Sequence, residues 1–142
     1  MKLNIGIDPG RSGSVAFLRG AEAWSVKLSE TPQDITDAVR EAIDGHDSFA
    51  ALEVVHSSPQ MGVRSAFTFG QSFGMAEMLL TCLGIPFERV RPQVWQRSLG
   101  CLTGGDKNVT KRRAQQLFPG VRITHANADA LLIAEYGRRL QQ

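Results

Sequence analysis

The sequence predicts a single α/β domain in which a five-stranded mixed sheet is flanked by helices. The length of 142 residues suits one domain, and a hydrophobic fraction of 42% is enough for a core. Three strand-like segments come first, helical and strand-like segments then alternate, and the chain closes with helical patterns. This order predicts residues 1–142 to be one domain.

Four strands are expected in the first half, because short apolar segments there are bounded by turn residues. The fourth is a continuous apolar run that carries one acid, Glu53. Between the third and fourth, Thr31 is a good N-cap ahead of Pro32, and Gly45 ends a helical pattern. The strands are expected at 3–8, 14–18, 23–28 and 49–55, with a tight connection at 9–13 and a loop at 57–63.

Helices dominate the second half. Thr110 is expected to cap a basic helix that Pro119 and Gly120 end. The expected elements are a helix at 66–83, a strand at 87–90, a helix at 92–99, a glycine-containing loop at 100–108, a helix from 110 to 117 and a last helix from about 127 to 140.

Charge, cysteine content and hydropathy limit which partners and which cellular compartment the sequence predicts. The net charge of +2 and pI near 8.8 are too weak to establish nucleic-acid binding, although cations cluster at 107–113 and 138–139. Cys82 and Cys101 have no paired spacing, so we expect reduced cytosolic thiols rather than a disulfide framework or zinc site. No segment approaches the ~18 apolar residues of a membrane span. The apolar stretch that Asp8 interrupts is too short for a signal peptide.

Three acids from distant segments stand against the apolar pattern around them. Asp8 ends the first strand, Glu53 interrupts a buried strand, and Asp129 is a lone charge on an apolar helical surface. Such carboxylates are costly to bury unless they are paired or bind a cation. His125 precedes Asp129 by four residues, so both can share a helix face.

Clustered oxygen ligands suit Mg²⁺ or Mn²⁺, and two such ions about 4 Å apart can hold a scissile phosphate. The sequence therefore predicts a metal-dependent nuclease, in which His125 could be a ligand, orient the water or accept its proton. Plainer interpretations stay open. Asp8 could be a turn residue, Glu53 could reach an arginine or solvent, Asp129 could be a first-turn acid, and His125 could cap a helix or lie at the surface.

Three motifs resemble those of the RuvC-like Holliday junction resolvases, and their order spans nearly the whole chain. Gly-Ile-Asp-Pro-Gly at 6–10, followed by Ser-Gly-Ser-Val-Ala at 12–16, resembles the first motif. Glu-Val-Val-His at 53–56, followed by Phe-Gly-Gln-Ser-Phe-Gly at 69–74, resembles the second acidic strand and the helix after it. His-Ala-Asn-Ala-Asp-Ala-Leu-Leu-Ile-Ala at 125–134 resembles the last motif.

The resemblance implies a ribonuclease H-like fold and a homodimer that cuts four-way DNA junctions symmetrically with Mg²⁺, for which Mn²⁺ can substitute. It places the protein in the cytoplasm of a bacterial or phage-infected cell, with no membrane partner. Lys107 resembles a lysine of the family's site, where it would stabilise the charge of the pentavalent phosphate. The implied metal ligands are Asp8, Glu53, His125 and Asp129.

The last motif is closer to the phage and chloroplast-type branch than to the bacterial one. That branch has its His four residues before the final acid, as His125 stands before Asp129. The bacterial branch has an acid or His three residues before it, where this chain has Ala126. The fourth ligand is therefore open.

Cations at 107–113 suit backbone phosphates, although a solvated face is the plainer interpretation. In a RuvC-like protein the segment 57–69 faces the junction centre, where an aromatic side chain could wedge against an unstacked base. Core packing is the other interpretation of Phe67 and Phe69, and the favoured one for Phe73. The candidates for DNA contact are Gln60, Arg64, Phe67, Phe69, Lys107, Lys111, Arg112 and Arg113.

The resemblance also assigns the dimer contact to the long helix, although a core helix needs the same apolar stripe. That stripe comprises Phe73, Met75, Met78, Leu79 and Cys82. Other functions remain possible. The substrate could be a flap or an RNA–DNA hybrid, or the protein could bind junctions without cutting them, which the intact acids disfavour. An actin-like nucleotide-binding protein would need a much longer chain.

Overall fold

The computed structural model describes residues 1–54 and 58–142. Three strands come first in this part of the chain, helices and strands then alternate, and three helices close it. The elements are β1 (Leu3–Asp8), β2 (Ser14–Arg19), β3 (Glu22–Lys27), α1 (Pro32–Ile43), β4 (Ser48–Glu53), α2 (Val63–Cys82), β5 (Phe87–Val90), α3 (Pro92–Ser98), α4 (Lys107–Leu117) and α5 (His125–Leu140). None of the described helices is long and apolar enough to cross a membrane.

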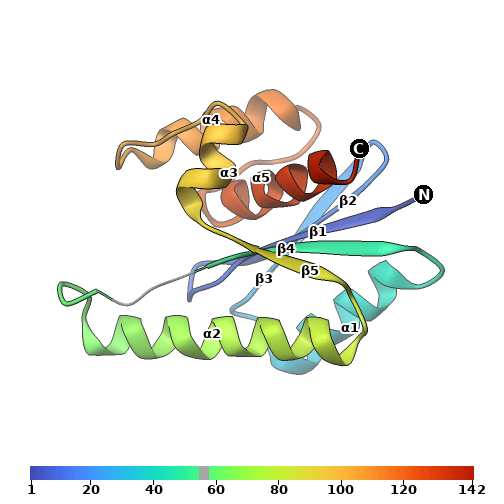
Figure 1. Cartoon of the computed structure of the whole chain (residues 1–142), viewed down its shortest axis with the longest axis horizontal. Helices are drawn as coiled ribbons and strands as arrows, with labels where there is room; N and C mark the ends of the chain where they lie inside the picture. The colour runs from blue at the N-terminus through green and yellow to red at the C-terminus, as the bar shows by residue number, and fades with distance from the viewer. Residues whose placement is uncertain (55–57) are drawn as a thin grey trace.

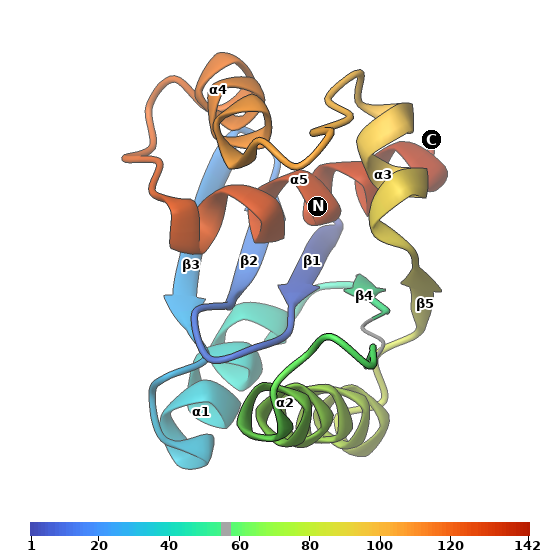
Figure 2. The same cartoon turned by 90° about the vertical axis from the view of Figure 1, so that its left-hand side faces the viewer.

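The five strands form one mixed sheet in the order β3-β2-β1-β4-β5, which Figure 2 shows from left to right. β2 runs antiparallel to β1 and β3, whereas β4 runs parallel to β1 and β5. The predicted five-stranded mixed sheet is therefore confirmed. From β1 the chain continues to β2 and β3 on one side of the sheet, and β4 then pairs with the other side of β1. The ends of β1 and β4 therefore form a topological switch point. Open α/β sheets commonly bind ligands at such a point.

Helices cover both faces of the sheet (Figure 1). Leu3, Ile5 and Ile7 alternate along β1 and pack toward α1 and α2 in one hydrophobic cluster. On the other face, Ala16 and Ala51 belong to a second cluster with residues of α3, α4 and α5. The alternation along β1 therefore directs Asn4, Gly6 and Asp8 to the α5 side.

α5 crosses the sheet at very short range because β1 carries glycine at the crossing. A Cβ on Gly6 would stand 2.2 Å from the Ala130 carbonyl oxygen and 2.3 Å from the Ala134 nitrogen, closer than packing allows. The Ser14 hydroxyl also donates to the Ala126 carbonyl at 2.7 Å and ties the start of α5 to β2. The N-terminal turns of α5 thus lie beside the end of β1.

Several predicted boundaries were wrong at their ends. β4 begins at Ser48 and ends at Glu53, and Val55, His56 and Ser57 lie outside the described residues. α2 begins at Val63, three residues before the predicted start. α5 begins at His125 because Thr124 and Asn127 form a capping box.

The predicted N-cap role of Thr110 was also wrong. α4 begins at Lys107, and the Asp106 side chain caps it by accepting from the Asn108 nitrogen at 2.9 Å. Thr110 is 3% exposed and lies inside the helix. Lys107 is consequently a residue of the first turn of α4 rather than part of a loop. The helix therefore sets the position of its Cα and Cβ atoms.

Candidate active site

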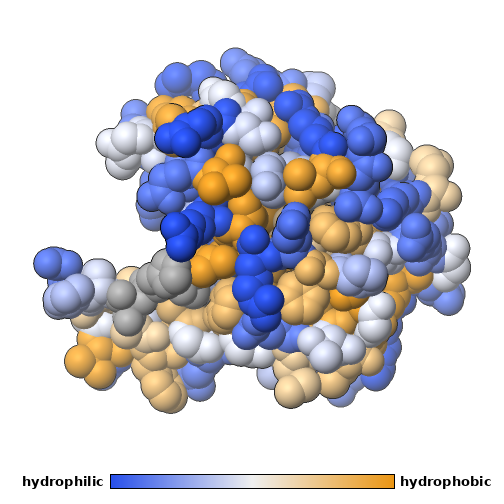
Figure 3. Space-filling model, viewed as in Figure 1, coloured by the Kyte–Doolittle hydropathy of each residue, from blue (hydrophilic) through white to orange (hydrophobic). Residues whose placement is uncertain are grey.

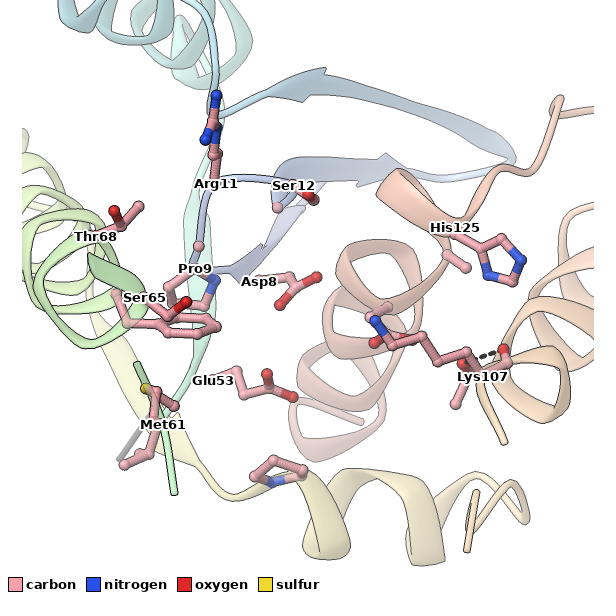
Figure 4. Close-up of a pocket in the computed structure, with 18 of the residues that line it drawn as sticks. Asp8, Pro9, Arg11, Ser12, Glu53, Met61, Ser65, Thr68, Lys107 and His125 are labelled. Atoms are coloured by element: carbon pink, nitrogen blue, oxygen red, sulfur yellow. Dashed lines mark hydrogen bonds between the residues drawn. The ribbon is translucent and has the colours of Figure 1, made fainter. Parts of the chain in front are cut away.

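A cleft of about 640 Å³ opens where β1 and β4 end. Its floor is formed by the ends of these strands and the β1–β2 turn, one wall by the start of α2, and the other by α4 and α5 (Figure 4). The side of the molecule above the start of α2 is visibly hollowed in Figure 3. The predicted site residues that line the cleft are Asp8, Glu53, Arg64, Phe69, Lys107, His125 and Asp129.

The strand register explains how Asp8 and Glu53 come together. Gly6 pairs with Ala51 in the parallel β1–β4 ladder, and each acid follows two residues later on its own strand. Both carboxylates therefore point to the α5 face at the same end of the sheet. Figure 4 shows them directed toward the same space.

Asp129 joins them through the close crossing of α5. It immediately precedes Ala130, whose carbonyl lies against Gly6, and Gly6 is two residues before Asp8. Ser14, which holds Ala126, is the cross-strand partner of Asp8. The three acids that the sequence places against its apolar pattern thus meet in one cleft.

Glu53 is the least exposed of the three acids, with a relative exposure of 8%. Its Oε2 accepts a hydrogen bond of 2.7 Å from Nε1 of Trp95, which lies in α3 and is fully buried. An ion pair with an arginine, one of the plainer interpretations, does not hold among the described residues, where the donor to Glu53 is a neutral indole.

The cluster raises the pKa of all three carboxyl groups. Burial is the main cause for Asp8, and the nearby charges of Glu53 and Asp129 raise its pKa further, well above its usual range. Burial raises the pKa of Glu53 to about 7, while its hydrogen bonds with Trp95 and Asp8 limit the rise. Burial also raises the pKa of Asp129, against hydrogen bonding by Thr110 and the charges of Lys107 and His125. A site that resists holding three negative charges attracts cations.

Lys107 and His125 differ in how they face the acids. The Lys107 side chain extends from the first turn of α4 toward the carboxylates in Figure 4, and its charge lowers the pKa of both Asp8 and Asp129. His125 is exposed at the first position of α5. Its ring points toward α4 rather than between Asp8 and Glu53 (Figure 4).

The other predicted DNA-contact residues do not line the cleft. Gln60 and Phe67 are exposed near the α2 wall, and Phe67 is 67% exposed. Arg112 is exposed on α4 and Lys111 is half-buried. Arg113 donates through Nε to the Leu99 carbonyl at 2.9 Å, so part of its guanidinium holds the loop before α4.

Sequence reasoning missed several residues of this region. Trp95 and Thr110 approach Glu53 and Asp129, and Arg11 and Gln93 line the cleft. Arg11 could have been found, since it is a cation in the turn directly after Asp8. Trp95 gave no such signal, because a tryptophan in a short helix is usually core.

The donor set fits hard divalent cations better than a closed metal cage. Among the described residues, no three His, Cys, Asp or Glu side chains converge to hold one ion. Mg²⁺ is usually bound by one or two carboxylates, with water and substrate phosphate completing the shell. Three oxygen-donor acids with raised pKa values around an open cleft suit that manner of binding.

The fold is a ribonuclease H-like one, and it is similar to the fold of RuvC. Thermus thermophilus RuvC in complex with a Holliday junction substrate is 19% identical with a TM-score of 0.64, covering 97% of this chain and 96% of that chain. A second Thermus thermophilus RuvC structure is 20% identical with a TM-score of 0.61, covering 98% and 96%. No protein-family model and no curated protein sequence matches the chain. The resemblance inferred from the motifs is thus confirmed at the level of the fold.

Proposed function

We propose that this protein is a Holliday junction resolvase, a divalent-metal-dependent endonuclease that makes paired, symmetric nicks in four-way DNA junctions. The observation that carries the proposal is the meeting of Asp8, Glu53 and Asp129 with Lys107 in one cleft of a RuvC-like fold. A similar structure is described as RuvC bound to a Holliday junction substrate, which supports the choice of substrate.

Asp8, Glu53 and Asp129 are the proposed ligands of two Mg²⁺ ions. Bound there, the ions would supply Lewis-acid activation of water and stabilisation of the leaving oxygen. The carboxylates would hold the ions at the end of the sheet. Because the acids are buried together, their negative charges are costly to form until cations bind. His125 lies beside Asp129, and we assign it as an outer ligand or proton acceptor.

Lys107 would stabilise the charge that gathers on the phosphate during hydrolysis. Its ammonium is the cation that acts on both Asp8 and Asp129, so it lies near the place where a bound phosphate would sit. It starts from the capped first turn of α4, so its backbone is already helical before substrate binds.

The two walls of the cleft would hold the DNA backbone. Arg64 lines the α2 wall, and Arg11 lines the floor with its side chain directed away from the carboxylates (Figure 4). Lys111 and Arg112 extend the cationic surface beyond the α4 wall. Cations in such places bind phosphates without reading sequence.

A homodimer would cut the junction symmetrically, and α2 is the proposed contact. Phe73, Met75 and Leu79 of its predicted stripe pack against the core, whereas Met78 and Cys82 are exposed. Val63 and Phe67 are also exposed, and Gly70 and Gly74 have open space before them. Sedimentation of the protein over a concentration series would test the dimer directly.

The cutting reaction is tested with a synthetic mobile four-way junction in Mg²⁺, beside a linear duplex, a flap and an RNA–DNA hybrid of matched sequence. Symmetric nicks confined to the junction are expected. Equal cutting of linear duplex would contradict a resolvase, and preference for the flap or hybrid would reassign the substrate.

Asp8→Asn is expected to abolish cutting while retaining junction binding. Asp37→Asn makes the same chemical change at an exposed position on α1 and serves as the control. Cutting by Asp8→Asn at the wild-type rate would refute the proposed site. If the wild-type protein binds the junction but no divalent ion supports cutting, the protein is a non-catalytic junction-binding module.

A further inference from the structure

The hydrogen bond from Trp95 to Glu53 joins a fully buried side chain to the least exposed acid of the cleft. The indole nitrogen lies 2.7 Å from Oε2, and Trp95 has no exposed surface. Glu53 lines the cleft and Trp95 does not, so the indole reaches the carboxylate from the protein interior. It occupies an oxygen of Glu53 without narrowing the space above the acids.

The chain brings Trp95 to this place by a short and well-fixed path. Val90 of β5 pairs with Glu53 of β4, and the Val54 nitrogen donates to the Val90 carbonyl at 2.8 Å. Pro92 then occupies the first helical position of α3, where its ring fixes the backbone angle. Trp95 follows in the first turn of α3, so its indole lies close to the end of β4, where Glu53 pairs with Val90.

Packing holds the indole once it is there. Trp95 belongs to the hydrophobic cluster on the α5 face, together with Ala51, Val90 and Leu99. Its side chain is among the largest that are fully buried in the described part of the chain. Rotation of the ring away from Glu53 would disturb that packing, so the donor is held in a fixed direction.

An indole N–H is chemically suited to orient a metal-binding carboxylate. It can only donate a hydrogen bond, so Glu53 is always the acceptor of this pair. It also carries no charge that would compete with a cation. A carboxylate has about four lone-pair sites, so one bond to Oε2 leaves the remaining acceptor capacity for other partners. Hydrogen bonds from outside the coordination shell commonly orient ligands in this way.

We propose that Trp95 is a positioning residue, which fixes the orientation of Glu53 so that its carboxylate is preset for divalent-cation binding. The proposal rests on the nuclease function proposed above, because it assigns Glu53 as a metal ligand. A structural alternative exists, since a buried indole needs a hydrogen-bond acceptor in any case. The two roles differ in whether cation affinity depends on the bond while the fold is kept.

The bond itself can be tested without any metal. The chain has two tryptophans, so a ¹⁵N-labelled sample gives two indole resonances, and Trp24 on β3 is an internal reference. Glu53→Gln is expected to shift the Trp95 indole resonance and to leave that of Trp24 in place. If neither resonance moves, the indole does not bind Glu53 and the proposal is overturned.

Cation binding provides the second readout, measured with Mn²⁺ on DNA-free protein by calorimetry. Trp95→Phe keeps an aromatic ring but removes the donor, and is expected to weaken Mn²⁺ binding by about 10- to 100-fold, the usual effect of losing such a partner. Trp24→Phe, which alters the ring stacked on Phe17, is the matched control and should leave the affinity unchanged. Circular dichroism and the Trp24 resonance show whether Trp95→Phe retains the fold.

The outcomes separate the two hypotheses. Wild-type affinity in folded Trp95→Phe would overturn the positioning role and leave the nuclease proposal standing. If Mn²⁺ fails to bind the wild-type protein and broadens no indole resonance, the metal site itself is wrong, and the positioning role falls with it. Should Trp95→Phe unfold, selective broadening of the wild-type Trp95 resonance by Mn²⁺, together with its shift in Glu53→Gln, supports the proposal. Equal broadening of both resonances overturns it.

Discussion

The ring of Phe69 lies against Gly10, so the start of α2 contacts the turn that directly follows Asp8. A Cβ on Gly10 would stand 2.7 Å from Cε1 of Phe69, and Gly10 has a φ of 123°, a backbone conformation that favours glycine. The contact joins the α2 wall of the cleft to its floor. Phe67, two residues earlier, is 67% exposed and free of such packing.

The first prediction follows from this difference. Phe69→Ala is expected to lower the thermal midpoint and the rate of cutting together, because it removes half-buried packing that supports the Asp8 turn. Phe67→Ala should leave the thermal midpoint unchanged and weaken junction binding by about 1–3 kcal/mol if the ring stacks on a base. Thermal denaturation and junction titration distinguish the two. The reverse pattern would mean that Phe69 is the residue that contacts DNA.

The sequence was sufficient to predict the sheet and the acids because both depend on local pattern. Asp8, Glu53 and Asp129 were each visible as a charge in an apolar segment, and strand alternation directs the two strand acids to one face. That α5 would bring Asp129 to them depends on Gly6, whose small size permits the close crossing. A glycine in a strand does not by itself reveal which helix approaches it.

The errors have physical causes as well. Thr110 has the chemistry of an N-cap, but Asp106 stands earlier and caps the helix first, so Thr110 became a buried interior residue. Trp95 could not be assigned from the sequence, because its partner lies 42 residues away and only the β4–β5 pairing brings them together. The cations at 107–113 looked alike in sequence but divide into Lys107 in the cleft, Arg113 bound to Leu99, and others outside.

A second prediction concerns Thr110, whose hydroxyl donates to the Lys107 carbonyl at 3.2 Å and also lies close enough to Asp129 to lower its pKa. Thr110→Val keeps the shape of the buried side chain but removes the hydroxyl from both partners. We expect it to raise the Mg²⁺ concentration for half-maximal cutting by about tenfold. Thr110→Ser retains the hydroxyl and should stay close to the wild type. Equal Mg²⁺ requirements for the Val and Ser variants would show that the hydroxyl has no part in the site.

The third prediction concerns the pH dependence of stability without divalent ions. Burial raises the pKa of Glu53 from 4.5 to about 7, so between these values the folded protein retains a proton that the unfolded chain releases. Stability should therefore be highest at the acidic end of this window and fall as the pH rises through it, by up to about 3 kcal/mol. The raised pKa values of Asp8 and Asp129 act in the same direction.

Urea denaturation of the metal-free protein across this pH range measures the slope. Glu53→Gln cannot ionise and should make the slope shallower. Added Mg²⁺ should restore stability at the higher pH, since a ligand that binds only the folded state stabilises it. Stability that rises with pH across the window would show that the carboxyl cluster is not buried as described.

The last prediction separates the reactive lysine from the cations that only hold DNA. Lys107 is directed toward the acids, so Lys107→Met should reduce the single-turnover cutting rate by about 100- to 1000-fold, the usual loss of a group that stabilises transition-state charge. Its junction affinity should change little.

Arg112 is exposed on the same helix but does not line the cleft. Arg112→Met should therefore weaken junction binding and lower the salt dependence of the affinity by about one counterion. Its cutting rate at saturating enzyme should be that of the wild type. Measuring binding over a salt series and cutting at saturation on both variants gives a clear test. If Lys107→Met merely weakens binding, Lys107 is one more phosphate contact, and the charge that stabilises the reacting phosphate must come from the metal ions or from Arg64 on the α2 wall of the cleft.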